Sequence, residues 1–258
     1  MKMNIIKTSV AVLALVGAVF TPQATLASGE TPHAPKQEWS FNGLFGTFDQ
    51  AAAQRGFQVY QEVCASCHGM NLLSYRHLSG IGFNEAEIKA IAATVEVQDG
   101  PDSEGEMFDR PGIPADRFIS PYPNPQAAAS SNGGKAPPDL SLMTKARLGG
   151  SNYVYGLLTG YADAPIEFEL PEDGNYNKYY PGHVIAMAAP LDDESVEYTD
   201  GTKPTLAQHA KDVTTFLAWA AEPEMEERKR MGIKVLLFLL VLTGMLYAVK
   251  RKVWEDLH

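Results

Sequence analysis

The sequence contains little cysteine and little positive charge. Cysteine occurs only twice in 258 residues, which excludes a small fold held together by several disulfides. Lysine and arginine total 21 against 31 aspartate and glutamate residues, so the formal net charge is −10. A protein that binds nucleic-acid phosphates needs a basic surface, and the composition argues against that class. Apolar residues still make up 45% of the chain, which favours a folded core over global disorder.

Long hydrophobic runs are also scarce, and the first lies at the N-terminus. Lys2 and Lys7 precede an apolar run over residues 10–20, and Pro22 ends this run. Residues 24–27, with alanine at each end, offer a cleavage point. Because the run is shorter than the ~20 residues that a membrane span requires, it predicts a secretory signal peptide over residues 1–27 and not a first transmembrane helix.

The second run covers residues 231–249. As a helix it would extend about 28 Å, close to the ~30 Å hydrocarbon thickness of a bilayer. The alternative is a buried core helix, which seldom lacks a polar face over this length. Basic residues at 250–252 follow directly and indicate a cytoplasmic end. We therefore expect a transmembrane anchor over residues 228–250 and a cytoplasmic tail over residues 251–258.

Export would place residues 28–227 outside the cytoplasmic membrane. This segment contains 12 basic and 29 acidic residues, so its net charge is −17. Such a charge would steer a basic protein toward it, and salt would weaken the steering. A candidate docking surface, with an ordinary solvated face as the alternative, consists of the acidic residues Glu96, Asp99, Asp102, Glu104, Glu106 and Asp109.

Both cysteines belong to one motif, Cys64-Ala65-Ser66-Cys67-His68, which follows a stretch of helical spacing over residues 48–63. Two thiols three positions apart on a helix share a face and can bond both vinyl groups of one porphyrin edge, while His68 turns back to the iron. A thioredoxin-like site would lie among strands that this region lacks, and a zinc site would need further ligands. The motif therefore predicts one covalently attached haem c with His68 as an iron ligand.

The second axial ligand is less tightly specified by spacing. Met187 is favoured, because it lies in an apolar, small-residue loop over residues 181–190 that turn residues flank and that can lie over a flat ring. His183 in the same loop and Met143 in an expected helix remain alternatives. Met70 follows the motif too closely to reach the opposite haem face, and the other methionines occur in the acidic loop or the membrane stem.

The rest of the exported segment predicts a mostly α-helical protein with long loops and no internal repeat. Expected helices cover residues 84–95, 137–149, 151–159 and 205–220. The last of these begins with a capping box at Thr205 and has an apolar stripe. Proline and glycine predict long surface loops over residues 97–125 and 160–180.

In their order along the chain, several segments resemble the cytochrome c1 family. They are RGFQVY at 55–60, the motif region at 63–69, YPNP at 122–125, PPDLS at 137–141, LLTGY at 157–161, Pro181-Gly182 with Met187, WAAEP at 219–223 and RKRMG at 228–232. Cys-x-x-Cys-His alone indicates only a c-type cytochrome, whereas this ordered set is specific to the family. The resemblance implies a class I c-type cytochrome fold with long loop insertions and one C-terminal transmembrane helix.

The resemblance also implies the haem contacts. His68 and Met187 would be the axial ligands, and Arg147 would pair with a haem propionate. The other interpretation of Arg147 is a cation at the C-terminal end of the expected helix 137–149. Asn132 and Tyr153 match further positions near the haem. Some bacterial relatives brace the ligand loop with a disulfide, for which this chain has no cysteine, so proline and glycine would restrain the loop.

The family role implied is electron relay in the cytochrome bc1 complex, by a subunit that is not catalytic alone. The haem would accept an electron from the Rieske iron–sulfur protein and pass it to a c-type cytochrome. Cytochrome b and the lipid membrane would be further partners, nucleic acid would not, and the complex would be dimeric. The expected location is the bacterial cytoplasmic membrane, crossed once, with the haem domain periplasmic and the C-terminus cytoplasmic.

Other classes of function remain to be weighed against this one. They are a stand-alone membrane-tethered electron carrier, a tethered thiol–disulfide oxidoreductase and a haem enzyme such as a peroxidase.

Overall fold

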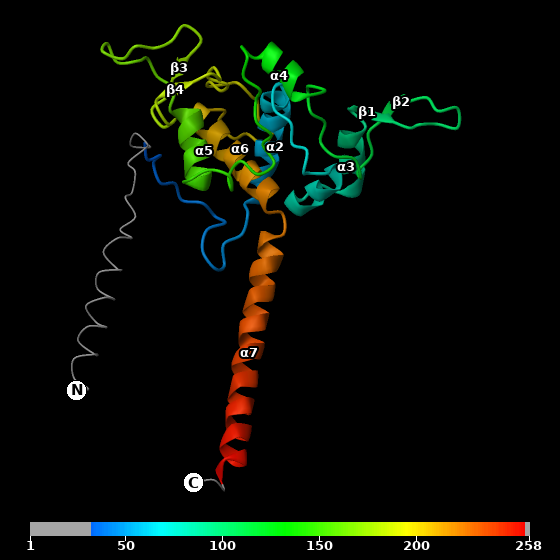
Figure 1. Ribbon diagram of the computed structural model, residues 1–258, viewed down its shortest axis with the longest axis vertical. Helices are drawn as coiled ribbons and strands as arrows, with labels where there is room; N and C mark the ends of the chain where they lie inside the picture. The colour runs from blue at the N-terminus through cyan, green and yellow to red at the C-terminus, as the bar shows by residue number, and fades with distance from the viewer. Residues whose placement is uncertain (1–31, 256–258) are drawn as a thin grey trace, which may run out of the picture. The chain divides into compact units, whose positions relative to one another are not determined.

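The computed structural model describes residues 32–255, so the expected signal peptide at 1–27 lies outside the described residues. Within this part of the chain, helices predominate and the strands form two short antiparallel hairpins (Figure 1). The expectation of a mostly α-helical protein is confirmed.

Two helices form the centre of the fold: α2 (Gln50–Glu62) and α6 (Leu206–Ala221). They pack so closely that a Cβ at Gly56 would collide with the backbone carbonyl of Asp212, so only glycine fits there. Beside this contact, Phe57 and Phe216 lie with ring centroids 5.5 Å apart. The close approach holds α2 rigidly at the point where the chain runs on into the Cys-x-x-Cys-His motif.

Side-chain caps mark where the expected helices begin. Asp49 caps α2 by accepting a hydrogen bond from the amide of Ala52. Asn84 and Glu87 form the reciprocal capping box of α3 (Glu85–Ala92), as the sequence predicts. Thr205 caps α6 through the amide of Gln208, but the side chain of Gln208 bonds to Asp212 and does not close the expected box.

Four further helices flank this pair. They are the 3₁₀ helices η1 (Cys64–Ser66) and η2 (Tyr75–Ile81), and the α-helices α4 (Pro125–Ser131) and α5 (Gly150–Thr159). Helix α5 packs on α6 and was expected, although Gly149 precedes it with no side-chain cap, in place of the expected Ser151.

The expected helix at 137–149 is wrong, because this segment forms turns and no regular helix. Its backbone and side chains bond to the chain after the haem motif. The amide of Leu140 donates to the carbonyl of Gly69 at 2.9 Å, and the hydroxyl of Ser141 accepts from the amide of Leu72 at 3.0 Å. Gly149 and Gly150 then adopt φ values of +87° and +53°, which a regular helix does not allow.

The expected loop at 97–125 is partly wrong. Strand β1 (Glu96–Asp99) pairs antiparallel with β2 (Phe108–Pro111), and the turn between them contains several of the acidic residues. Arg110 on β2 bonds Asp99, at the turn end of β1, and Asp116, in the chain after β2. A second, smaller hairpin pairs β3 (Asn175–Tyr176) with β4 (Val184–Ile185) inside and after the expected loop 160–180.

Helix α7 (Met225–Val253) contains the second apolar run. It is long and apolar enough to cross a membrane, and no residue of its most apolar stretch is buried in the described structure. The alternative of a core helix is therefore wrong. Pro223 lies between α6 and α7, as expected.

One charged network lies inside the α2–α6 contact. The carboxylate of Asp212 is fully buried and accepts two hydrogen bonds from the guanidinium of Arg55, at 2.8 and 3.1 Å, and one from Gln208. The phenol of Tyr198 lies under Arg55, and its hydroxyl bonds to the buried His209 at 2.9 Å. These bonds satisfy most of the polar groups that the helix contact removes from water.

We expect Asp212→Asn to lower the free energy of unfolding by about 3 kcal/mol, because it removes the buried counter-charge of Arg55 and leaves only the half-exposed Asp200 as its ion-pair partner. Urea titration in detergent, followed by far-UV circular dichroism, measures the change. Lys145→Gln removes a half-exposed ion pair with Glu222, which keeps Arg228 as a partner, and should change stability little. Equal effects of the two substitutions would contradict the assignment of Asp212 as a buried structural charge.

Candidate functional site

The two cysteines lie at the end of α2, in the 3₁₀ turn η1. The amides of Cys67 and His68 both donate to the carbonyl of Cys64, at 3.1 and 2.9 Å. Both thiols are free, and Cys64 packs against the hydrophobic core. Burial raises the pKa of the Cys64 thiol to about 12, with a smaller contribution from Cys67. A reactive redox cysteine needs a lowered pKa, so this environment does not favour a thiol–disulfide oxidoreductase.

The imidazole of His68 is oriented by one hydrogen bond. Its Nδ1 lies 2.7 Å from the carbonyl oxygen of Pro138, which can only accept, so Nδ1 carries the proton. The other ring nitrogen, Nε2, is then an unprotonated donor for a metal. Burial also lowers the pKa of His68, which favours the neutral ring that metal ligation requires.

The carbonyl of Pro138 is itself held in place by the segment around it. Besides the bonds from Leu140 and Ser141, the carboxylate of Asp139 accepts from the amide of Asn71 at 2.7 Å. The phenol of Tyr60 adds a bond to the carbonyl of His68 at 3.3 Å. The sequence analysis missed these supporting roles, although the segment PPDLS was among those that carried the resemblance.

Met187 lies just after the β3–β4 hairpin, and its backbone is tied to two other segments. The hydroxyl of Tyr161, at the end of α5, donates to the carbonyl of Met187 at 3.0 Å. The side-chain amide of Asn175 donates to the carbonyl of Ala186 at 3.3 Å. Hydrogen bonds therefore restrain the loop where proline and glycine alone were expected to do so.

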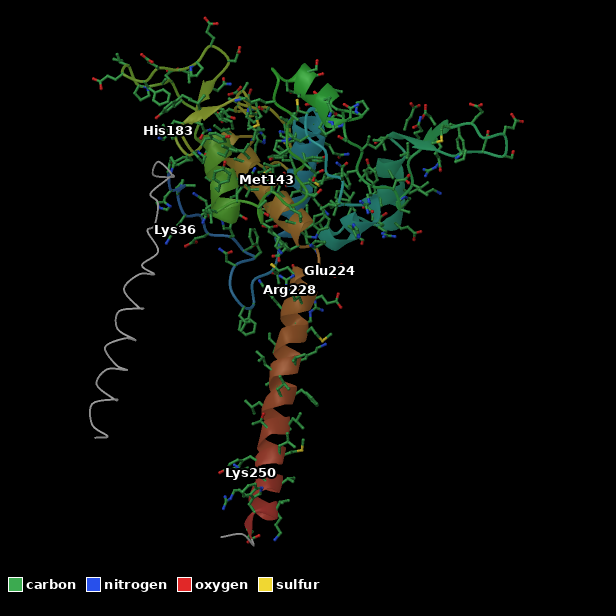
Figure 2. All side chains as sticks on the ribbon, in the orientation of Figure 1. Lys36, Met143, His183, Glu224, Arg228 and Lys250 are labelled. Carbon is green, nitrogen blue, oxygen red and sulfur yellow. The ribbon has the colours of Figure 1, made fainter. Side chains whose placement is uncertain are left out.

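His183 has a structural role in the same hairpin. Its ring stacks on Tyr176 with centroids 5.5 Å apart, and its Nδ1 lies 3.1 Å from the carbonyl of Asn177. Asn177 is fully buried and bonds to the carbonyl of Leu157 on α5 at 2.8 Å. Met143, the other alternative ligand, packs against the hydrophobic core. Figure 2 shows His183 at the β3–β4 hairpin and Met143 in the body of the domain.

Arg147 and Tyr153 lie near each other, at the beginning of α5. Burial raises the pKa of Tyr153, and the Arg147 cation partly offsets this rise. Among the residues that the structure describes, no carboxylate lies within ion-pair distance of Arg147. Because the turn segment before α5 is not a helix, the interpretation of Arg147 as a C-terminal helix cation is wrong.

Asn132 occupies a different environment at the end of α4. Its side-chain amide donates to the hydroxyl of Tyr122 at 3.1 Å and to the carbonyl of Ala128 at 2.7 Å. These contacts fix the turn that leads into the Pro138 segment. None of them joins Asn132 to Arg147 or Tyr153.

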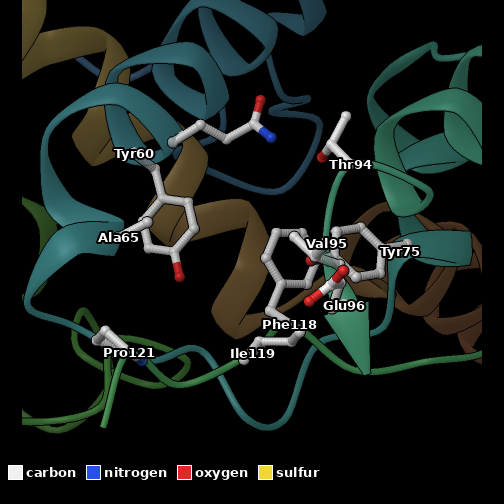
Figure 3. Close-up of a pocket in the computed structure, with 10 residues that line it drawn as sticks. Tyr60, Ala65, Tyr75, Thr94, Val95, Glu96, Phe118, Ile119 and Pro121 are labelled. Carbon is white, nitrogen blue, oxygen red and sulfur yellow. The ribbon is translucent and has the colours of Figure 1, made fainter. Parts of the chain in front are cut away.

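A cavity of about 440 Å³ opens beside the motif (Figure 3). The rings of Tyr60, Tyr75 and Phe118 form one part of its wall, and Ala65, between the two cysteines, forms another. His68 and Met187 do not line it. The cavity therefore lies next to the candidate haem-binding residues without containing the axial candidates.

The residues present fit a covalently attached haem. Two free thiols are presented three positions apart, an imidazole offers an unprotonated Nε2, and a restrained loop presents a thioether. Over residues 32–255 no group of three or more His, Cys, Asp or Glu side chains could hold a metal ion.

Comparison with known proteins agrees with this fit. The family model described as "Cytochrome C1 family" matches residues 39–257. The chain is 48% identical to "Cytochrome c1" of Rhodospirillum rubrum, with 98% of each chain covered. It is 52% identical to "Cytochrome c1 1, heme protein, mitochondrial" of Arabidopsis thaliana, over 97% of this chain and 84% of that protein.

A third relative is longer than this chain. "Cytochrome b/c1" of Bradyrhizobium diazoefficiens is 46% identical over 95% of this chain, which spans only 39% of that protein. The family match extends over the haem motif, the Met187 loop and α7 together. The chain therefore belongs to the cytochrome c1 family.

Proposed function

We propose that the chain is the electron-relay subunit of a cytochrome bc1 complex and that it holds one haem c through thioether bonds from Cys64 and Cys67. The observation that carries the proposal is the hydrogen bond between His68 Nδ1 and the carbonyl of Pro138. It leaves Nε2 free to ligate iron, directly after the two thiols. Family membership supports a c-type haem in the same place.

When bound, the haem supplies a one-electron Fe(III)/Fe(II) couple. The residues of the chain hold this couple and set its potential. His68 and Met187 would hold the iron, and because a thioether donates less charge to Fe(III) than an imidazole does, Met187 as a ligand would raise the potential. If His68 and Met187 both ligate the iron, the protein would leave no open position for peroxidase chemistry.

Electron donor, electron acceptor and neighbouring subunits follow from this proposal. We propose the Rieske iron–sulfur protein as donor, a c-type cytochrome as acceptor, cytochrome b as a partner in the membrane, and a dimeric complex. The names of two relatives support cytochrome b: "Cytochrome b/c1" of Bradyrhizobium diazoefficiens and "Cytochrome b-c1 complex catalytic subunit, mitochondrial" of Candida albicans.

The proposed topology places residues 28–227 on the periplasmic side, with α7 crossing the bacterial cytoplasmic membrane and residues 251–258 in the cytoplasm. The apolar exposed length of α7 and the basic residues Lys250, Arg251 and Lys252 in its last turn support this orientation. Cleavage of residues 1–27 is part of the same proposal.

The β1–β2 hairpin is our candidate surface for the acceptor cytochrome. Asp99 is neutralised by Arg110, and Asp102 accepts hydrogen bonds from the amides of Glu104 and Glu106 in the turn. The carboxylates of Glu104, Glu106 and Asp109 have no basic partner among residues 32–255. They are exposed, and a basic partner protein would gain long-range attraction from them.

Co-purification separates the proposal from its alternative, a stand-alone membrane-tethered carrier. Mild detergent extraction of the tagged chain should recover a dihaem cytochrome b and an iron–sulfur protein in fixed ratio. Recovery of the chain alone under conditions that preserve known bc1 complexes would favour the stand-alone carrier.

We expect Met187→His to retain covalent haem and to lower its midpoint potential, because imidazole stabilises Fe(III) more than a thioether does. Redox titration of the visible spectrum measures the potential. Met143→Leu is the matched control and should leave the midpoint unchanged, since Met143 packs against the hydrophobic core. An unchanged midpoint in Met187→His would exclude Met187 as the ligand.

Arg147→Gln should also lower the midpoint potential, because an unpaired propionate would leave a negative charge near the iron that stabilises Fe(III). Arg147→Lys keeps the charge and should restore most of the potential. If the midpoints of both variants equal that of the parent, Arg147 does not pair with a propionate.

Reduction of a basic cytochrome c should slow steeply as ionic strength rises. The reason is that salt at 0.1 M screens the attraction between charged groups on the two proteins when they are more than about 10 Å apart. The triple variant Glu104→Gln, Glu106→Gln, Asp109→Asn should flatten this salt profile. Glu224→Gln with Glu227→Gln, at the start of α7, should not. Stopped-flow rates at several salt concentrations provide the comparison, and a profile that the hairpin variant leaves unaltered would remove the hairpin as docking surface.

A further inference from the structure

The loop over residues 40–48, here called the foot loop, is fastened to the first turns of α7. The ammonium of Lys229 donates to the carbonyls of Phe41 and Gly46, at 2.8 and 2.9 Å. The carboxylate of Glu226 accepts from the amide of Phe48 at 2.8 Å. In Figure 1 this loop is the blue segment beside the upper end of α7. Three hydrogen bonds thus fix its position along the helix.

The tip of the foot loop is apolar and exposed. Phe45 is 79% exposed and Leu44 is 59% exposed, whereas Phe48 is buried and its ring packs against Phe41 at 5.0 Å. Gly43 adopts a φ of +78°, which forms the turn that presents the tip. The loop therefore holds two large apolar side chains outward, level with the beginning of the apolar run of α7.

One cation near this tip has no ion-pair partner in the described part of the chain. Three consecutive cations lie at the start of α7. Arg228 pairs with Glu222 at 2.9 Å, and Lys229 donates its hydrogen bonds to carbonyls of the foot loop. Arg230 has no carboxylate within ion-pair distance in the described part of the chain. Lys234 follows four positions later on the same helix face and is exposed.

A hollow of about 150 Å³ lies between the foot loop and α7. Leu44, Phe45 and Ile233 give it apolar walls, and its charged lining consists of Lys229, Arg230 and Glu226. Lys229 and Glu226 are already bonded to the backbone of the foot loop, which leaves Arg230 as the free cation of this lining. An apolar wall beside an unpaired cation matches the chemistry of an anionic phospholipid, whose chains are apolar and whose head carries a phosphate. It also explains why basic residues occur at the end of α7 opposite to the one that the positive-inside rule favours.

We propose that the foot loop is a membrane-contacting element. Leu44 and Phe45 enter the interface of the periplasmic leaflet, and Arg230 with Lys234 binds the phosphate of an anionic phospholipid there. The inference rests on the proposed crossing of the membrane by α7. Lys234 reaches the phosphate from within the apolar run because its long side chain can extend to the interface.

The test uses the haem-loaded full chain in vesicles of phosphatidylcholine and phosphatidylglycerol. A nitroxide is attached at Phe45→Cys, at Leu240→Cys in the middle of α7, and at Ile166→Cys, an exposed apolar residue between α5 and β3. Electron paramagnetic resonance then measures collisions with oxygen, which concentrates in lipid, and with a water-soluble nickel chelate. The parent chain controls for labelling of Cys64 and Cys67.

We expect the labels at positions 45 and 240 to collide mainly with oxygen, and the label at position 166 to collide mainly with the nickel chelate. A label at position 45 that favours nickel, while the one at 240 favours oxygen, overturns the inference and leaves the span intact. A label at position 45 that neither reagent reaches means that a protein subunit covers the loop, and this also overturns it. Nickel contact at position 240 would overturn the span itself.

The phosphate contact has a separate readout. Spin-labelled phosphatidylglycerol should associate with the parent protein about five-fold more strongly per participating cation than spin-labelled phosphatidylcholine, as expected for a cation near an anionic surface. Arg230→Gln should reduce this preference, and Lys178→Gln, an exposed lysine beside the β3–β4 hairpin, should not. Equal association of both lipids with the parent protein contradicts the assignment of Arg230 to a lipid phosphate.

Discussion

The orientation of one imidazole ring is the constraint on which the rest of the structure depends. Nε2 of His68 can ligate a metal when the proton is on Nδ1, and the carbonyl of Pro138 favours that tautomer and fixes the ring orientation. That carbonyl is fixed because its segment bonds back to the residues that follow His68, through Gly69, Asn71 and Leu72. The metal ligand and the group that orients it therefore form one structural unit, which the α2–α6 contact presents from a rigid base.

Met187, the proposed second ligand, is positioned by different means. Met187 belongs to a loop with little regular structure, and long-range hydrogen bonds from Tyr161 and Asn175 hold its backbone. Tyr161 follows α5 directly, and Asn175 is part of β3. The Met187 loop is therefore held in place by the helix and the hairpin next to it. These hydrogen bonds restrain the Met187 loop, for which the chain has no cysteine to form a bracing disulfide.

Sequence alone predicts the parts of this site that local rules control. Three features can be recognised from a short stretch of sequence: the Cys-x-x-Cys-His spacing, the cap at Asn84 and the apolar run of α7. The turns at 141–149 were mistaken for a helix because the bonds that prevent it, from Leu140 and Ser141, go to residues about 70 positions earlier. The β1–β2 hairpin was missed because its strands are only four residues long and charged. The roles of Pro138, Tyr161 and Asn175 depend on contacts that no local pattern shows.

The central claim is that both axial positions of one covalently bound haem are filled from the chain. The measurement that tests it most directly is a redox-titrated visible spectrum of the purified, haem-loaded membrane protein. The account predicts a low-spin c-type spectrum, one single-electron transition and no change on addition of cyanide. A high-spin spectrum, cyanide binding, or a colourless protein after authentic export and maturation would contradict it.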